Sequence, residues 1–250
     1  MKVSIITATL NNAGTIEDAI TSILGQKHNN IEHIIVDGGS KDGTLDIIKK
    51  HEEWISKVIS EQDSGVYEAM NKGLKVATGD IVAFLNADDF YANEEVVAKI
   101  VETMLANNVD CCYGDLEYVA RDNPEKTIRR WKSHSYRDDL FEKGWHPPHP
   151  TFVVKRQIYE EYGYFNLKFK IAADYELMLR FMKKHDIKSC YIPSVLVKMR
   201  AGGKSNKNLS QIIKANIECY RAWRENGLKI SPFIMLRKPA SKLVQCVRRN

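Results

Sequence analysis

The stretch Ile81-Val82-Ala83-Phe84-Leu85-Asn86-Ala87-Asp88-Asp89 decides the fold class. Its five leading apolar residues, rich in strand formers, predict a strand over 81–89 that is buried on both faces. An amide and two neighbouring carboxylates stand at its carboxyl end, where open α/β sheets bind their ligands. Carboxylate oxygens suit Mg²⁺ or Mn²⁺. The alternative is that Asp88 or Asp89 caps a helix beginning near Asn93.

Strands and helices alternate in the residues before this stretch. We expect strands at 2–10, 32–37 and 57–60, and helices at 15–24, 45–51 and 66–77. The helices carry apolar residues at helical spacing, whereas the strands are continuous β-forming runs. Four strand units within about ninety residues, joined by helices, predict a parallel sheet with right-handed crossovers.

Local signals refine these helices. Thr15 followed by Asp18 predicts a weak capping box, and Asp42 is expected to cap the second helix in a tight turn. Gly73 costs its helix roughly 1 kcal/mol relative to Ala, which predicts the close approach of another backbone. The glycine-rich turn at 38–44 has neither the phosphate-loop spacing nor the GxGxxG dinucleotide pattern.

The pattern changes after a helix expected at 94–106. Short strands are expected at 110–113, 117–120, 127–131, 152–154, 189–192 and 195–199. A strong helix is predicted at 172–184, a flexible loop at 200–205 and a last long helix at 208–225. These segments predict a second, smaller part of the fold with a mixed sheet.

The composition is that of a globular protein with one large domain or two small ones: 250 residues, 44% hydrophobic and 28% charged. No apolar run reaches the length of about 18 residues that a membrane span needs, and the N-terminus leads directly into a strand, so we expect neither a span nor a signal peptide. The five cysteines form no CxxC pair and no zinc spacing. Reduced thiols and a cytoplasmic location follow as expectations.

The net charge of +5 is concentrated at the C-terminus. Residues 229–250 contain six basic residues and no acidic one, so the rest of the chain is nearly neutral and a nucleic-acid partner is not expected. Apolar residues alternate with the basic ones, which predicts a peripheral contact of this tail with an anionic membrane. A C-terminal helix packed on the body is the alternative.

Short polar side chains follow the first two expected strands. Thr7, Thr9 and Asn11 lie at the end of the first strand, and Asp37 ends the second. Hydroxyl, amide and carboxylate groups of this kind are ordinary loop residues, and they are also suitable partners for a ribose or a base edge.

Four linked motifs resemble the family 2 glycosyltransferases of bacterial surface-polysaccharide synthesis, especially the short colanic-acid, capsule and O-antigen type. They are Asp37-Gly38-Gly39-Ser40-x-Asp42-Gly43-Thr44; Glu61-x-Asp63-x-Gly65-x-Tyr67-x-Ala69-Met70-Asn71-x-Gly73; Ala77-x-Gly79; and Asn86-Ala87-Asp88-Asp89. The later segments 149–151, 173–177 and 202–205 are also similar to that subgroup.

The resemblance implies the GT-A fold, an α/β architecture with a Rossmann-like nucleotide-binding half and a mostly parallel sheet continuous with a smaller mixed acceptor half. We expect one catalytic domain at 1–228, divided into 1–107 and 108–228, and the basic tail at 229–250. By resemblance, Asp37 accepts from a uracil N–H and Thr7 and Thr9 line the same pocket. Asn11, Asp63, Asn71 and Asp88 complete the implied nucleotide-binding set.

The resemblance also implies that Asp88 and Asp89 hold a Mn²⁺ or Mg²⁺ ion on the diphosphate, because a pyrophosphate leaving group needs positive charge. Many relatives carry a carboxylate where this chain has Asn86, which predicts weaker metal binding. Asp174 matches the general base, which would remove the proton of an attacking sugar hydroxyl and invert the anomeric configuration. Its structural alternative is a first-turn acid that stabilises the helix dipole, and Glu176 is the fallback base.

Four further residues are candidates for a diphosphate or acceptor loop. His146 and His149 flank two prolines. Arg200 and Lys204 stand next to the pair Gly202-Gly203 and are expected to close on the diphosphate as a mobile lid. Surface histidines and a solvated basic loop are the alternatives.

The sequence thus predicts an inverting, metal-dependent glycosyltransferase that moves a sugar from a nucleotide diphosphate, with UDP favoured, to a glycan or lipid-linked acceptor. We expect it in the cytoplasm, at the cytoplasmic face of the inner membrane. A non-catalytic nucleotide-sugar-binding scaffold is one alternative. A sugar-phosphate nucleotidyltransferase is another, although 9–14 is not the glycine-rich basic loop which that class needs.

Overall fold

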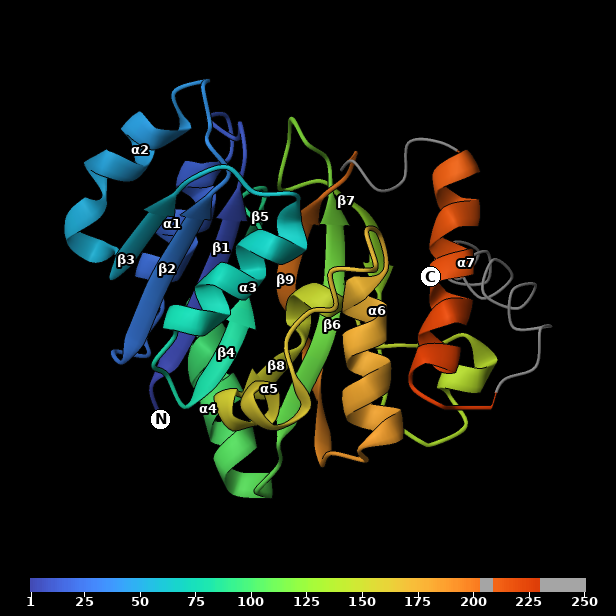
Figure 1. Cartoon of the computed structure of the whole chain (residues 1–250). Helices are drawn as coiled ribbons and strands as arrows, with labels where there is room; N and C mark the ends of the chain where they lie inside the picture. Colours follow the sequence, from blue (N-terminus) through green and yellow to red (C-terminus); the bar gives the residue numbers. More distant parts are fainter. Residues whose placement is uncertain (203–208, 230–250) are drawn as a thin grey trace.

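A single mixed sheet of nine strands runs through the computed structural model, which describes residues 1–202 and 209–229 (Figure 1). The strand order is β3-β2-β1-β4-β8-β6-β9-β5, and β7 pairs with β6 outside this path. The strands are β1 (Val3–Thr9), β2 (Ile31–Asp37), β3 (Lys57–Ser60), β4 (Ile81–Phe84), β5 (Asp89–Tyr91), β6 (Cys111–Val119), β7 (Thr127–Trp131), β8 (Val153–Lys155) and β9 (Ser189–Arg200).

Helices cover both faces of this sheet. The α-helices are α1 (Ile16–Leu24), α2 (Thr44–Lys50), α3 (Val66–Val76), α4 (Val96–Asn107), α5 (Arg156–Tyr162), α6 (Ala173–Met178) and α7 (Leu209–Glu225). Short 3-10 turns are η1 (Glu52–Trp54), η2 (Phe141–Lys143) and η3 (His149–Thr151), and the π-helix η4 (Leu179–Lys184) continues α6. In Figure 1, α3, α5 and α6 lie in front of the sheet and α1 and α4 lie behind it.

The first half is the predicted parallel sheet. β1 pairs in parallel with both β2 and β4, and β2 pairs in parallel with β3. All seven residues of β1 and all four of β4 are buried. Alternate β1 residues contribute to different cores: Ile6 packs with α3 on one face, and Ile5 packs with α1 and α4 on the other. Burial on both faces explains the continuous apolar runs.

The strand expected at 81–89 is shorter than predicted. β4 ends at Phe84, and the backbone N–H of Asp89 donates to the carbonyl of Asn86 (3.0 Å), which closes a turn. The chain then enters β5, which pairs antiparallel with β9. Leu85 and Ala87 are buried in this turn, so the apolar pattern gave no sign that the strand had ended.

In the second half, two pairs of short predicted strands are each one long strand. Segments 110–113 and 117–120 merge into β6, and 189–192 and 195–199 merge into β9. β6 and β9 pair in parallel, with register shifts around Asp115. The shifts occur where Gly114 approaches Leu196 so closely that a Cβ on the glycine would lie 2.5 Å from the leucine Cγ. Glycine and proline within these strands therefore mark irregularities rather than ends.

Three local predictions about helices were wrong in detail. Thr15 makes no side-chain cap at α1, and its hydroxyl is buried without a hydrogen-bond partner. Asp42 does not cap α2; Gly43 precedes the helix, and Asp42 instead accepts from the backbone N–H of Thr44 (3.1 Å) within the turn. A Cβ on Gly73 would lie 2.5 Å from Cγ2 of Ile6, so α3 approaches a side chain of β1 rather than another backbone.

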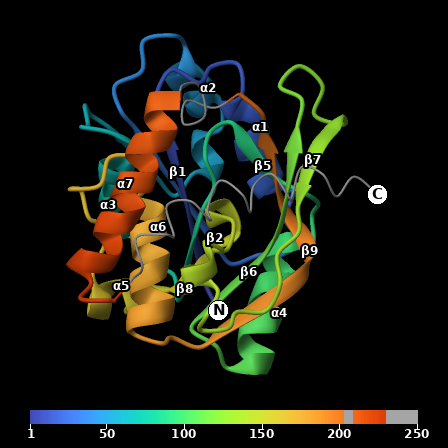
Figure 2. The ribbon, with the colours of Figure 1, turned by 90° about the vertical axis from the view of Figure 1, so that its right-hand side faces the viewer.

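The helices predicted for the second half are confirmed. The segment 172–184 forms α6 and η4, and α7 begins at Leu209. Figure 2 shows α7 alongside α6, and the indole N–H of Trp223 on α7 donates to the Tyr175 hydroxyl on α6 (2.9 Å). Among the helices of residues 1–202 and 209–229, none combines the length and the hydrophobicity of a transmembrane span. Lys204 and the tail from residue 230 onward lie outside the described residues.

Candidate active site

The carboxyl ends of the parallel strands bring the polar residues of the first half together. Thr9 and Asp37 are register partners in β1 and β2, and Ser60 of β3 is the partner of Asp37 on its other side. The backbone N–H of Gly38 donates to the Thr9 carbonyl (2.9 Å), which extends the ladder one residue into the loop. This edge of the sheet is where an open α/β fold binds its ligand.

The loops that follow β1 and β2 are hydrogen-bonded into one unit. Asn11, in a left-handed conformation (φ 55°), receives Lys41 N–H on its side-chain oxygen (2.9 Å) and donates its own N–H to the Ser40 hydroxyl (2.8 Å). Ala13 N–H donates to the Asp42 carboxylate (3.0 Å). Asn11 is exposed at this edge, and its side-chain oxygen already accepts the hydrogen bond from Lys41.

Asp37 is the organising residue of the second loop. Its carboxylate is fully buried and accepts from the backbone N–H groups of Gly39 (3.0 Å) and Ser40 (3.0 and 3.2 Å), and from the hydroxyls of Ser40 and Ser60. Three of these donors converge on Oδ2, whereas Oδ1 is contacted by Ser40 alone. The side chain holds the loop in place from inside.

Thr7 lies deeper in the sheet than a pocket-lining residue would. It is fully buried, and its hydroxyl is 3.1 Å from Nε2 of His33 on β2. Burial lowers the pKa of His33 to about 3, so this imidazole is neutral at physiological pH. The hydroxyl of Thr9, by contrast, is at the loop and makes a long contact of 3.4 Å with the Asn12 side chain.

Asp63 stands next to the Asp37 loop from the adjacent β3–α3 loop. It is half-buried, and its Oδ1 accepts from the backbone N–H of Gly65 (3.0 Å). Its Oδ2 lies 2.8 Å from the position that a Cβ on Gly38 would occupy. The absence of a side chain at Gly38 is what admits this carboxylate.

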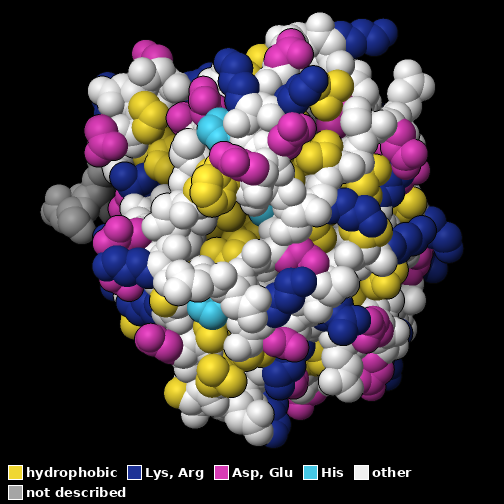
Figure 3. All heavy atoms as spheres, turned by 90° about the vertical axis from the view of Figure 1, so that its left-hand side faces the viewer, with side chains coloured by type: hydrophobic (Ala, Val, Ile, Leu, Met, Phe, Trp, Pro, Cys, Tyr) yellow, Lys and Arg dark blue, Asp and Glu magenta, His cyan; other side chains and the backbone are white. Residues whose placement is uncertain are grey.

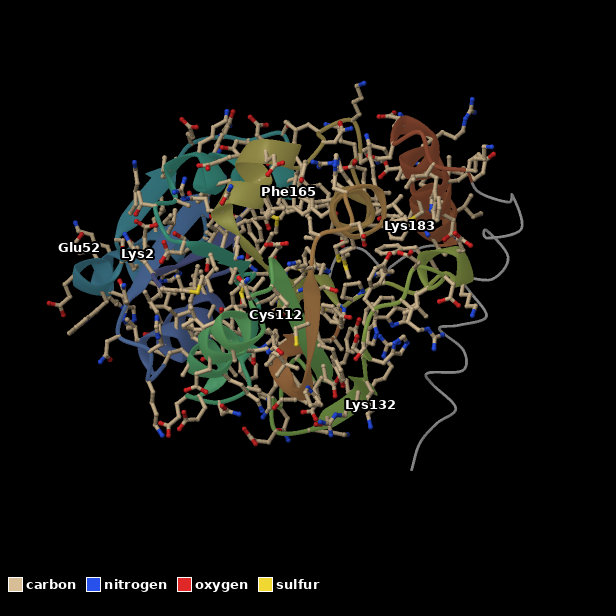
Figure 4. The ribbon with its side chains drawn as sticks, turned by 90° about the horizontal axis from the view of Figure 1, so that it is seen from below. Lys2, Glu52, Cys112, Lys132, Phe165 and Lys183 are labelled. Carbon is tan, nitrogen blue, oxygen red and sulfur yellow. The ribbon has the colours of Figure 1, made fainter. Side chains whose placement is uncertain are left out.

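Asn71 joins the two halves of the fold. Its amide donates to the Phe165 carbonyl (2.9 Å) and accepts from the Phe165 N–H (3.0 Å), so both ends of the side chain are occupied. Phe165, labelled in Figure 4, comes from the segment between α5 and α6 and stacks on Tyr67 of α3. The structure therefore gives Asn71 a structural contact on the inner side of α3.

The two acidic residues after β4 have different environments. Asp88 is half-exposed in the turn, whereas Asp89 is 1% exposed and begins β5. Oδ2 of Asp89 accepts from the Asn86 amide (3.0 Å), and its Oδ1 is buried without a partner. Burial and the neighbouring charge of Asp88 raise the pKa of Asp89 well above its ordinary value. The helix-cap alternative is wrong, because α4 begins at Val96 after Glu95.

The carboxylate oxygens of Asp88 and Asp89 are suitable ligands for a divalent cation. A buried carboxylate oxygen without a partner, beside a second and more accessible carboxylate, is a position where positive charge would be favourable. Among the described residues no group of three or more His, Cys, Asp or Glu side chains could hold a metal ion. Mg²⁺ and Mn²⁺ sites that rely on one or two carboxylates take their other ligands from substrate phosphates and water.

Arg200 reaches this turn from the end of β9. It is 4% exposed; one guanidinium nitrogen donates to the Asp88 carbonyl (3.0 Å), and another pairs with the Asp18 carboxylate on α1. The guanidinium also lies over the Phe90 ring at 5.0 Å. The sequence predicted a mobile cation that closes on the diphosphate; in this structure the Arg200 side chain is buried and contacts Asp88 and Asp18 instead.

Asp174 lies in the first turn of α6, between two partners. The Tyr67 hydroxyl shares its single hydrogen between the Ile171 carbonyl (2.8 Å) and Oδ1 of Asp174 (3.2 Å), and Nδ1 of His149 is 3.3 Å from Oδ2 of Asp174. The side chain of Asp174 is 21% exposed and that of His149 is 37% exposed. Burial and the Asp174 charge raise the pKa of Tyr67 above its ordinary value, so Tyr67 is a stable donor.

Asp174 and His149 also line a small and largely apolar cavity. Its remaining lining residues come from both halves of the fold: Met70, Phe84, Phe152, Tyr159, Phe165, Leu177 and Met178. Glu176, the fallback base, is 2% exposed and is bonded to Arg180 and Asn226, so it does not reach this cavity.

His146 does not join His149 at the carboxylate. Its ring makes edge-to-face contacts with Trp131 (5.4 Å) and with Tyr175 (5.5 Å), and Nδ1 is 2.9 Å from the Pro147 carbonyl. Lys204 cannot be placed, since it lies outside the described part of the chain.

Two residues of this region were not predicted from sequence. Asp18, which pairs with Arg200, was interpreted as part of a helix cap, and Tyr67 was not assigned a role at Asp174. Both contacts join residues more than 100 positions apart, so no local pattern could have indicated them.

The face on the β3 side carries acidic and basic side chains intermixed with small hydrophobic groups, without a single extended basic surface (Figure 3).

An α/β sheet with polar and acidic side chains at the carboxyl ends of its strands is typical of enzymes that bind their ligand at that edge. The model of glycosyl transferase family 2 matches residues 4–163, so the chain belongs to that family, and its class of activity is glycosyl transfer. The family predicted from the sequence motifs is confirmed.

Curated relatives agree with this assignment. The chain is 30% identical over 208 residues to a PGL/p-HBAD biosynthesis glycosyltransferase of Mycobacterium tuberculosis, covering 81% of this chain and 78% of that protein. It is 37% identical over 143 residues to the putative teichuronic acid biosynthesis glycosyltransferase TuaG of Bacillus subtilis, covering 55% and 56% of the two proteins.

Solved structures confirm the predicted GT-A fold. The chain superimposes on S. aureus TarS 1-349 in complex with UDP-GlcNAc with a TM-score of 0.68 at 17% identity, covering 90% of this chain and 65% of that one. It superimposes on the mannosyltransferase PcManGT from Pyrobaculum calidifontis, in complex with GDP-Man and Mn²⁺, with a TM-score of 0.67 at 20% identity, covering 98% and 70%.

Proposed function

We propose that this protein transfers a sugar from a nucleoside diphosphate to a hydroxyl of a glycan or lipid-linked acceptor, with inversion at the anomeric carbon. The observation that carries the proposal is the position of Asp174. This carboxylate of the second half is held by a hydrogen bond from Tyr67 of the first half, beside the cavity that both halves line. A base at this junction suits a reaction between a donor bound by one half and an acceptor bound by the other.

Asp174 would act as the general base. The acceptor oxygen forms a bond to the anomeric carbon as Asp174 takes its proton, and the bond from that carbon to the diphosphate oxygen breaks. The nucleoside diphosphate leaves with the electron pair. A single displacement of this kind inverts the configuration, and one positioned base typically contributes a factor of about 10²–10⁴. Tyr67 and His149 contact different oxygens of Asp174 and so restrict its orientation.

The donor diphosphate would bind at the acidic turn after β4. Asp88 is the more accessible carboxylate and would hold a Mn²⁺ or Mg²⁺ ion directly, with Asp89 behind it. When bound, such a cation neutralises the charge that develops on the leaving diphosphate. Arg200 would hold Asp88 in position by donating a hydrogen bond to the backbone carbonyl of Asp88, and it would not contact the sugar donor.

The nucleoside would lie along the loops after β1, β2 and β3. Thr9, Asn11 and Asp63 are near this edge, and we assign them to the nucleotide site. Thr7, Asp37 and Asn71 are bonded within the protein, and we assign them to the support of that site. His149 belongs to the acceptor side through Asp174, and His146 lies farther along the same segment.

The relatives support a substrate class for the proposal. Two curated relatives are named for teichuronic acid and PGL/p-HBAD biosynthesis, and structural neighbours hold UDP-GlcNAc or GDP-Man. We therefore propose a nucleotide-sugar donor, with a UDP-sugar tested first, and an acceptor in bacterial cell-surface polysaccharide synthesis. Residues 1–228 would be the catalytic domain, and the basic tail would contact the cytoplasmic membrane face.

The test is release of UDP or GDP from a panel of nucleotide sugars in the presence of Mn²⁺, for the wild-type protein and for Asp174→Asn. Donor-selective release by the wild type would identify the sugar. With an acceptor present, Asp174→Asn should lose transfer by about 10²–10⁴-fold and still bind the nucleoside diphosphate. Transfer by Asp174→Asn at the wild-type rate would contradict the assignment of the base.

A nucleotide-sugar-binding scaffold is the second candidate, because one observation favours it. The residue two positions before Asp88 is the amide Asn86, whose side chain donates to Asp89 and adds no charge to a metal site. Tight binding of UDP without turnover of any donor, with or without acceptor glycans, would favour the scaffold over the enzyme.

A further inference from the structure

The segment that leads into α6 is held by a carboxylate of α7. Glu218 accepts hydrogen bonds from three consecutive backbone N–H groups, those of Lys170 (3.0 Å), Ile171 (2.9 Å) and Ala172 (2.9 Å). The Glu218 side chain is half-buried. The candidate base, Asp174, lies two residues after this segment, so the position of the segment bears directly on the position of the base.

The three bonds constrain the backbone at the entry to α6. Successive N–H groups that point at one carboxylate form a concavity that favours negative charge. Ala172 is the N-cap residue of α6 and forms no side-chain cap, so Glu218 also supplies the negative charge that the N-terminus of a helix favours. Hydrogen bonds to a charged acceptor are stronger than those between neutral groups. Residues 170–172 are therefore held by a group from another helix.

Tyr67 holds the other side of the same backbone segment. Its hydroxyl lies 2.8 Å from the Ile171 carbonyl and 3.2 Å from Oδ1 of Asp174. The N–H of Ile171 is thus bonded to α7, and its carbonyl is bonded to α3. A shift of Ile171 would change the position of the hydroxyl that contacts Asp174.

α7 also bonds to residues that follow Asp174. The indole N–H of Trp223 donates to the Tyr175 hydroxyl (2.9 Å), and the Asn226 amide donates to Oε1 of Glu176 (2.9 Å). Figure 2 shows the two helices side by side. One helix therefore holds the chain on both sides of the candidate base.

We propose that Glu218 is a positioning residue for the general base: it fixes the entry to α6 so that Asp174 is directed at the acceptor hydroxyl. This inference rests on the proposed function, because it requires Asp174 to act as the base. Glu218 satisfies the N–H groups before α6, and the Asp174 carboxylate contacts the side chains of Tyr67 and His149. Residue 218 lies beyond the residues that the family model matches and beyond the sequence motifs.

The experiment is a double-mutant cycle between Glu218 and Asp174 in the full-length protein. The reaction followed is the hydrolysis of the nucleotide sugar that the panel selects, with Mn²⁺ present and water in place of the acceptor hydroxyl. Glu218→Leu removes all three bonds and should lower kcat by about 10- to 100-fold, since a misplacement of about 1 Å has an effect of this order. The KM for the donor and the affinity for UDP should stay within about twofold, because the donor binds to the first half.

The second arm of the cycle starts from Asp174→Asn. In this background Glu218→Leu should lower kcat by no more than about twofold further, because a positioning residue acts only through the base that it positions. A residue that merely maintains the fold would lower kcat by the same factor in both backgrounds. The difference between the two factors is therefore the readout.

Two further variants complete the design. Glu218→Gln keeps one oxygen for the N–H groups of Ile171 and Ala172 and should lower kcat less than Glu218→Leu, by about 3- to 10-fold. Glu225→Gln removes the same charge from the same helix, where the carboxylate contacts Arg221 and Asn166, and it should leave kcat unchanged. Thermal melting verifies that each variant is folded.

The outcomes separate the two proposals. A wild-type kcat in folded Glu218→Leu, together with a loss in Asp174→Asn, overturns the role of Glu218 and leaves the glycosyltransferase proposal intact. An equal loss from Glu218→Leu in both backgrounds also overturns it. Wild-type turnover by Asp174→Asn contradicts the proposed base and this inference together. If Glu218→Leu does not fold, Glu218→Gln decides: a wild-type kcat in that variant overturns the inference.

Discussion

At the scale of single residues, the site is built from acidic side chains in contrasting environments. Asp37 and Asp89 are buried, and Asp63 and Asp88 are half-exposed. Asp37 supports the loop after β2 through its hydrogen bonds, and Asp89 is buried behind the more accessible Asp88. Charge alone does not distinguish the two roles, because burial and existing hydrogen bonds decide which oxygen remains available.

The buried Arg200 leads to a prediction at this scale. Arg200→Met should remove the donor to the Asp88 carbonyl and lower the free energy of unfolding by roughly 2 kcal/mol. It should also weaken UDP binding in Mg²⁺, because the Asp88 turn loses its support. Urea unfolding and calorimetry measure the two effects.

The partner of Arg200 provides the comparison. Asp18 is 56% exposed, so Asp18→Asn should cost only about 0.5 kcal/mol and change UDP affinity little. Equal effects of the two variants would show that the ion pair, rather than the bond to the Asp88 carbonyl, supports the turn.

At the scale of elements, close packing of helices on the sheet fixes where each loop begins. α3 carries Tyr67 and Asn71, and its distance from β1 is set at Gly73, where only a hydrogen fits against Ile6. At the opposite edge of the sheet, Glu32 of β2 accepts hydrogen bonds from Lys2 and Ser4 at β1 and from Thr78 before β4. These bonds connect the beginnings of the three strands.

Gly73→Ala tests the packing of α3. A methyl group would meet Ile6 Cγ2 at 2.5 Å, so the helix must shift, and we expect a loss of about 1–3 kcal/mol despite the better helix propensity of alanine. The exposed Lys75→Ala on the same helix should change stability by less than about 0.5 kcal/mol. Urea denaturation compares them; a stabilising Gly73→Ala would contradict the tight contact.

Glu32 makes stability depend on pH. Burial alone would raise its pKa, but hydrogen bonds from Lys2, Ser4 and Thr78 outweigh burial and lower the pKa to about 2. Because the folded pKa lies below the unfolded value of 4.5, this contribution is complete above about pH 4.5 and is lost as the pH falls toward 2.

The matched variant is Glu32→Gln. It should reduce stability at neutral pH by roughly 2 kcal/mol and reduce the loss of stability between pH 5 and about pH 2. Chemical denaturation across that range measures both. An identical pH profile in wild type and variant would show that Glu32 is not the group responsible.

At the scale of the whole molecule, the candidate base depends on how the two halves meet. The Tyr67–Asp174 bond and the Asn71–Phe165 bonds all run from α3 to the second half, and the cavity lies between them. The reaction proposed here requires donor and acceptor sites on one continuous sheet, and the nine-stranded order provides that continuity.

Asn71→Ala should therefore lower the stability of the junction between the two halves and leave nucleotide binding nearly unchanged. It leaves the buried N–H and carbonyl of Phe165 without partners, which costs about 2–4 kcal/mol. Urea unfolding should report this loss, while UDP affinity of the folded variant stays within about twofold of the wild type. A loss of UDP affinity without a loss of stability would restore the nucleotide-binding role that the resemblance implies for Asn71.

The sequence by itself determined the alternation of strands and helices in the first half, because apolar periodicity and turn residues are local properties of the chain. It also determined the family, since the motifs at 37–44, 61–73 and 86–89 carry it, and it placed the acidic residues at strand ends.

Only the tertiary structure decided what those residues contact. The turn at Asn86–Asp89, the merging of short segments into β6 and β9, and the burial of Arg200 beneath Asp88 depend on partners distant in sequence. The carboxylate of Asp37 accepts several hydrogen bonds from its own loop, whereas that of Asp63 accepts one. This difference depends on which N–H and O–H groups the folded chain brings close to each carboxylate. Those donors come from separate strands and loops, and so no local pattern encodes them.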